Sequence, residues 1–147
     1  MWSLLLELFM VFLSEKTWER HANPWSGWTR VLSMPLLMLG LYFRNIWILM
    51  GVVIWSIINP MIFPKPKSTN NWMSKGVLGE RLYYQDGKKI KKDYPTLLNI
   101  TNVPVFLLFL YFGWQQQLIP MVLTGILSSV IKFWFIDRMV LFYDKNH

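Results

Sequence analysis

The stretch NPMIFPKPKSTNNWMSKGVLGER, residues 59–81, decides how the chain is organised. It begins as the end of an apolar segment, which three prolines break off. The remainder is polar and cationic, yet it still carries Trp72 and Val77. This composition is typical of a backbone that leaves a bilayer and continues along its surface. We therefore expect one membrane hairpin before this stretch and a second hairpin after it.

The overall composition favours a membrane protein. Apolar residues make up 54% of the chain and aromatic residues 17%, with nine tryptophans, a residue type that gathers at membrane interfaces. The formal net charge is +7, but eight of the fifteen Lys and Arg residues lie within 65–92. A cationic loop between apolar segments is typical of the cytoplasmic side of a membrane protein, so we expect no nucleic-acid partner. The chain has no cysteine, which excludes disulfides and thiolate metal sites.

The pattern predicts an all-α, polytopic membrane protein with residues 1–147 as a single domain. Each predicted span is close to the ~20 residues that cross a ~30 Å hydrocarbon core. The apolar segment 1–14 is too short to span, so we expect an interfacial helix or a helix packed on the others. The four predicted transmembrane helices form two hairpins and cover residues 25–43, 45–63, 97–113 and 118–137. Asn23–Pro24 predicts a turn before the first of them, with Asn23 as N-cap and Pro24 at the first position of the helix.

The loop 64–96 is predicted to lie on the membrane surface. Ser68 or Thr69 is expected to cap a short helix that Gly79 ends. Asp86–Gly87 then predicts a small β-hairpin around it, starting at Leu82.

The orientation follows from the charges of the turns. The two hairpin tips, at Arg44–Asn45 and at 114–117, contain a single cationic residue, Arg44. The positive-inside rule therefore places the central loop and both termini in the cytoplasm.

Polar residues of three separate segments are predicted to meet at the cytoplasmic end of the helices. Such a polar cluster either holds an anionic headgroup or forms an ion-pair network that ties the loop to the helices. We favour the network, because charges at membrane depth must be paired. The polar cluster consists of His21, Asn23, Trp25, Arg30, Asn59, Ser68, Asn71, Trp72, Lys75, Glu80, Arg81, Lys132, Asp137 and Arg138.

No known catalytic pattern is complete in the sequence. His21 is the one histidine away from the terminal His147, so a histidine metal site and a bis-histidine haem are not predicted. The eight glycines are scattered and form no phosphate-binding loop. One hypothesis is that Glu80 and Asp137 act with His21 as acid–base groups. Neither a metal nor a cofactor is assigned, and enzyme status stays open.

Three motifs carry a family resemblance: HANPWSGWTR at 21–30, the stretch 59–81 quoted above, and KFWFIDRMV at 132–140. The chain resembles a family of small prokaryotic integral membrane proteins that is known as a domain of unknown function. The resemblance covers roughly residues 18–144 and leaves the N-terminal apolar segment outside. It implies a four-helix protein of the prokaryotic cytoplasmic membrane and supplies no activity, substrate or cofactor.

Two functions from different classes are compatible with these features. The first is a non-catalytic accessory subunit of a larger membrane complex, with protein partners or with copies of itself that pack through the last span. The alternative is a small membrane enzyme or carrier that binds a lipid headgroup or another amphiphile at the polar cluster. In both cases membrane lipids are expected partners.

Overall fold

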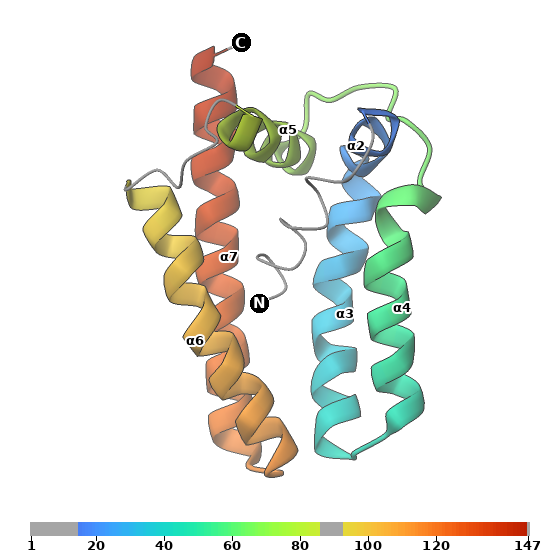
Figure 1. Ribbon diagram of the computed structural model, residues 1–147, viewed down its shortest axis with the longest axis vertical. Helices are drawn as coiled ribbons and strands as arrows, with labels where there is room; N and C mark the ends of the chain where they lie inside the picture. Colours follow the sequence, from blue (N-terminus) through green and yellow to red (C-terminus); the bar gives the residue numbers. More distant parts are fainter. Residues whose placement is uncertain (1–14, 86–92, 147) are drawn as a thin grey trace.

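The computed structural model describes residues 15–85 and 93–146. These residues form six helices and no strand, which confirms the all-α prediction. The helices α3 and α4 form one antiparallel hairpin, α6 and α7 form the other, and α5 lies across one end of both (Figure 1). The bounds are α2 (Glu15–His21), α3 (Pro24–Tyr42), α4 (Ile46–Ile62), α5 (Trp72–Gln85), α6 (Tyr94–Trp114) and α7 (Leu118–Asn146).

The two hairpins turn by the same local geometry. In the first, the N–H of Asn45 donates to the Gly40 carbonyl and the N–H of Arg44 to the Leu41 carbonyl, which is a Schellman motif. Arg44 takes the left-handed conformation, with φ of 50°. Gln116 takes the same role in the second hairpin, with φ of 56°. The predicted turn at Arg44–Asn45 is therefore confirmed.

Side chains at these turns hold the hairpins together at one end. The Arg44 guanidinium donates to the Trp114 carbonyl at 3.1 Å and lies 5.4 Å from the centre of the Trp114 ring. Gln116 Nε2 donates to the Tyr42 carbonyl at 2.9 Å. The two tips are thus fixed to each other, and the hairpins are free to diverge toward α5.

Local capping signals start three of the helices. Asn23 has an extended backbone and accepts a hydrogen bond from the N–H of Trp25, with Pro24 as the first helical residue, as the sequence predicts. Asn45 caps α4 in the same way. Asp93 caps α6 through the N–H of Thr96 and also accepts a hydrogen bond from the Tyr83 hydroxyl. Burial and this hydrogen bond to Asp93 raise the pKa of Tyr83 to about 12.

The surface helix α5 differs from the prediction in length. Gly79 does not end it, because the helix continues to Gln85. A Cβ at Gly79 would overlap the Met139 carbonyl, so this glycine serves a close crossing of α5 over α7 and not a helix stop. Leu82 is therefore helical and not the start of a strand. The rest of the predicted β-hairpin, residues 86–90, lies outside the described residues, as does the predicted helix 1–14.

Two of the described helices, α6 and α7, are long and apolar enough to cross a membrane. The apolar helix α4 has only 17 residues, and α3 has 19 but begins with the mixed sequence PWSGWTR, which lowers its mean hydropathy. By length and composition the prediction of four spans is therefore supported for two. The last helix also continues to Asn146 instead of ending near residue 137, because its extension packs against α5 through the buried Met139 and Val140.

Apolar packing is divided into two clusters. One fills the space between the hairpins near their tips and consists of Leu37, Leu41, Val52, Phe106, Phe109 and Met121. The other lies between α5 and α7 and consists of Tyr83, Phe135 and Met139. This division leaves unfilled space between the hairpins, below α5.

We predict that Gly79→Ala destabilises the protein, because the added methyl group meets backbone of α7 that cannot rotate away. Overpacking of this kind costs about 1–3 kcal/mol, and the melting temperature of the detergent-purified protein measures it. Gly51→Ala is the matched control, since a Cβ there meets nothing within 4 Å. An unchanged melting temperature for Gly79→Ala would refute the close crossing.

Candidate functional site

A cavity of about 210 Å³ lies between the two hairpins and below α5. Apolar residues of the tip cluster, among them Leu37, Val52 and Phe106, form one wall. Helix α5 contributes Gly76 and Val77 to the opposite wall. The polar residues that line the cavity are Arg30, Ser33, Ser56, Glu80, Asn102, Ser128, Ser129 and Lys132.

Three charged residues from three helices meet at the α5 end of this cavity. Lys132 Nζ lies 3.5 Å from Glu80 Oε1 and 4.5 Å from the centre of the Phe135 ring. Arg30 donates through Nε to the Ser26 carbonyl at 3.3 Å, and among the described residues it forms no ion pair within 4 Å. Glu80 is buried, with 8% of its surface exposed. The site therefore holds two positive charges and one negative charge.

Beside the cavity, a chain of hydrogen bonds joins α2, α3 and α4. The Thr29 hydroxyl donates to the Trp25 carbonyl at 2.7 Å, so its oxygen accepts from Asn59 Nδ2 at 2.9 Å. This directs Asn59 Oδ1 toward Ser26, whose hydroxyl donates to it at 2.6 Å. The Ser26 oxygen then accepts from His21 Nδ1 at 3.2 Å. The tautomer of His21 assigned by this chain carries its proton on Nδ1.

His21 is held neutral by its surroundings. Burial, followed by the positive charges of Arg30 and Lys132, lowers the pKa of His21 well below 6.5. Because Arg30 and Lys132 both line the cavity, His21 lies close to the cavity, although His21 itself is not a lining residue. Its ring packs edge-on against Trp18.

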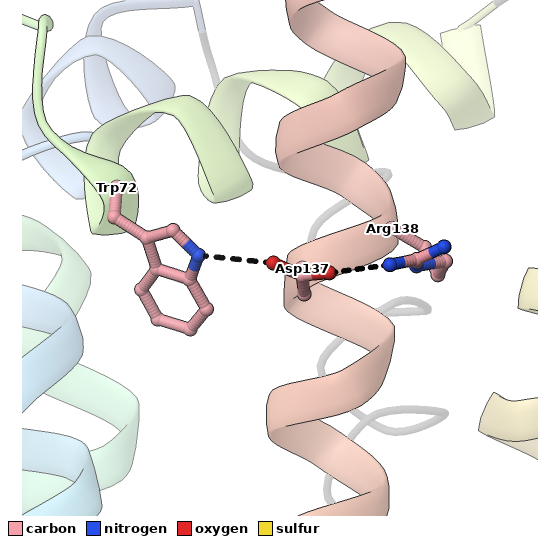
Figure 2. A network of polar contacts seen from close by, with 3 residues as sticks. All are labelled: Trp72, Asp137 and Arg138. Atoms are coloured by element: carbon pink, nitrogen blue, oxygen red, sulfur yellow. Dashed lines mark hydrogen bonds and ion pairs between the residues drawn. The ribbon is translucent and has the colours of Figure 1, made fainter.

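A second polar group lies where α5 begins. Figure 2 shows Trp72 reaching Asp137 on α7, with Nε1 3.5 Å from Oδ1, while Arg138 donates to the other carboxylate oxygen at 2.6 Å. The Trp72 ring also stacks on Trp28, and Phe133 lies 6.2 Å from it. Since Phe133 lines the cavity, these aromatic rings adjoin its wall.

The predicted polar cluster is divided by the structure into several groups. Arg30, Glu80 and Lys132 meet at the cavity, His21 joins Asn59 through Ser26, and Trp72 meets Asp137 and Arg138. Lys75 pairs with Asp144, Asn23 donates to the Pro64 carbonyl, and Asn71 accepts from the N–H of Ser74. Arg81 is half-buried on α5 and does not line the cavity. Trp25 and Ser68 are exposed.

Among the described residues, no hydrogen bond or ion pair joins the three residues of the acid–base hypothesis to one another. Glu80 pairs with Lys132, Asp137 with Arg138, and His21 with Ser26. Sequence reasoning missed Ser26 and Thr29 as partners. The lone Asn59 in an apolar helix was the available signal, because a buried amide needs hydrogen-bond partners, and two hydroxyls three residues apart on one helix face are suited to supply them.

Residues 9–147 match a family described as a family of unknown function, DUF6653. The chain belongs to that family. The match starts at residue 9, so it includes part of the N-terminal apolar segment that the motif-based resemblance left outside. No curated protein and no solved structure matches the chain.

We predict that stability falls when the pH is lowered below about 6.5. The unfolded chain binds a proton at His21 there and the folded chain does not, which costs up to ~1.4 kcal/mol per pH unit. Thermal unfolding between pH 8 and pH 5 measures this loss, and His21→Gln should flatten the profile. His147→Gln is the matched control, and a profile equally steep in His21→Gln would contradict the prediction.

Proposed function

We propose that the protein spans a membrane and binds a singly charged anionic lipid in the cavity between its hairpins. One observation carries this proposal: a cavity with largely apolar walls has two cationic side chains and one carboxylate at its α5 end. This is the complement of an amphiphile with one negative charge.

The exposed surface of the helices supports a membrane location. Trp47, Ile119 and Leu32 expose 77%, 72% and 67% of their surface, and they belong to three different helices. In the apolar 18-residue stretch of each long helix, only 28% of α6 and 22% of α7 are buried within the protein. A helix at the centre of a soluble protein would bury most of such a stretch. Outward-facing apolar residues on both hairpins are what contact with lipid requires.

The same surface supports four spans. Helices α3 and α4 lie side by side with lengths of ~29 Å and ~26 Å at 1.5 Å per residue. Bilayers adapt to mismatches of a few ångströms. The cationic loop after α4 then lies on the side of α5, which we propose to be the cytoplasmic side, together with both termini.

The charge count supports an anionic ligand. Glu80 compensates Lys132, with which it is paired, and Arg30 is left with a formal charge that no described carboxylate neutralises within 4 Å. A cation in a largely apolar site is costly unless it is paired. A phosphodiester supplies one negative charge and the acceptor geometry that guanidinium groups match. The apolar wall beyond it suits an acyl chain.

We predict opposite effects for two neutralising variants. Arg30→Gln should reduce the ratio of bound phosphatidylglycerol to bound phosphatidylethanolamine about tenfold, since a charge-assisted contact is lost. Glu80→Gln should raise the same ratio, because it removes the competing carboxylate. Native mass spectrometry of the protein from nanodiscs with equal amounts of both lipids measures the ratio.

Lys65→Gln is the matched control. It removes one positive charge from an exposed side chain that pairs with Glu19, and neither residue lines the cavity, so the lipid ratio should not change. If the three charged residues only stabilise the fold, Arg30→Gln and Glu80→Gln will both lower the melting temperature and leave the ratio unchanged. The same lipid ratio is measured for a chain that lacks residues 1–14. If only this shortened chain prefers phosphatidylglycerol over phosphatidylethanolamine, the proposal is contradicted.

The accessory-subunit function stays a prediction, and a different experimental result would support it. Gentle extraction from the native membrane would then yield a larger complex of fixed stoichiometry. In that complex the wild-type chain would carry no preferentially bound anionic lipid.

A further inference from the structure

We propose that Asn102 and Ser128 form a second subsite of the cavity, which binds the ester carbonyl of a glycerophospholipid. This inference rests on the proposed function, because it identifies the class of anionic lipid. It concerns a different part of the cavity, below the three charged residues.

The amide of Asn102 is oriented by its neighbour on α7. The Ser128 hydroxyl donates to Asn102 Oδ1 at 2.8 Å. Asn102 therefore keeps its Nδ2 donors, which have no hydrogen-bond partner among the described residues, and the residue lines the cavity. The fixed oxygen leaves the amide nitrogen as the group that a ligand meets.

The other serine hydroxyl groups that line the cavity already donate their protons to backbone carbonyls. Ser33 donates to the Arg30 carbonyl at 2.6 Å, and Ser56 donates to the Val52 carbonyl at 2.7 Å. Ser129 likewise donates to the Gly125 carbonyl at 2.9 Å. Among the described uncharged side chains that line the cavity, the Asn102 amide is thus the remaining donor. The ligand must bring an acceptor to this place.

The spacing of the two subsites selects the ligand class. Ser128 and Lys132 are four residues apart on α7, so the Asn102 subsite lies about one helical turn, ~6 Å, from the charged end. In a glycerophospholipid the glycerol separates the anionic phosphate from the ester carbonyls. A fatty acid has its charge and its carbonyl in one carboxylate and cannot occupy both subsites. The cavity therefore matches an ester-linked glycerophospholipid.

The competing explanation is that Asn102 and Ser128 only join α6 to α7. Polar pairs of this kind stabilise helix contacts within membranes. A purely structural pair would bind an ester and an ether lipid equally well. Comparing these two lipids therefore separates the explanations without requiring a mutation.

The experiment uses the full-length protein in nanodiscs with equal amounts of ester-linked phosphatidylglycerol and its diether analogue. We expect native mass spectrometry to show several-fold more bound ester lipid, since an ether oxygen is the weaker acceptor. Asn102→Leu should abolish this preference and keep the preference for phosphatidylglycerol over phosphatidylethanolamine. Thr124→Val is the matched control, because Thr124 does not line the cavity and its hydroxyl donates to the Pro120 carbonyl of the same helix, and it should bind as the wild type does.

A second variant guards against misfolding of Asn102→Leu. Ser128→Ala leaves the amide in place but removes the bond that orients it, so the ester preference should fall partly. Equal binding of ester and ether lipid by the wild type, with anionic preference intact, overturns this inference alone. Loss of anionic preference in the wild type overturns the proposed function and this inference with it.

Discussion

The close crossing of α5 over α7 is the contact on which the rest of the structure depends. Gly79 brings the backbone of α5 against the Met139 carbonyl, and Gly76 faces Ile136. Glu80 follows directly and is thereby placed within 3.5 Å of Lys132. At its other end α5 reaches the turn between α2 and α3, where the Ser74 hydroxyl donates to the Ala22 carbonyl. Two glycines thus position the helix that covers the cavity.

The tips of the hairpins are joined at the end of the protein opposite α5. Arg44 and Gln116 fix the two hairpins together at one end, whereas α5 bridges them at the other end. The space between is filled by Phe106 and Phe109 near the tips but not near α5. A cavity therefore arises from two fixed ends and an incompletely packed middle. Its polar end lies beneath the helix that the glycines position.

Local signals were readable from the sequence, and contacts between distant segments were not. Asn23–Pro24 and Arg44–Asn45 predicted their turns, because caps and turns depend on neighbouring residues. Gly79 was misread as a helix stop, since its role depends on a carbonyl of α7. The sequence predicted a common depth for the polar residues but not their pairing, such as that of Trp72 with Asp137 or of Glu80 with Lys132. The cavity could not be predicted, because it depends on how far the hairpins diverge.

The charge count also bears on the choice between a binding site and a structural network. A network that satisfies itself needs equal numbers of opposite charges, and the polar group of Asp137 and Arg138 meets that condition. The cavity group does not, because Arg30 and Lys132 share the single Glu80. His21, which could otherwise add a third positive charge, is held neutral by burial and by these same cations. Since an unpaired, half-buried cation in a largely apolar site destabilises the fold, a bound anion would stabilise this protein as well as occupy its site.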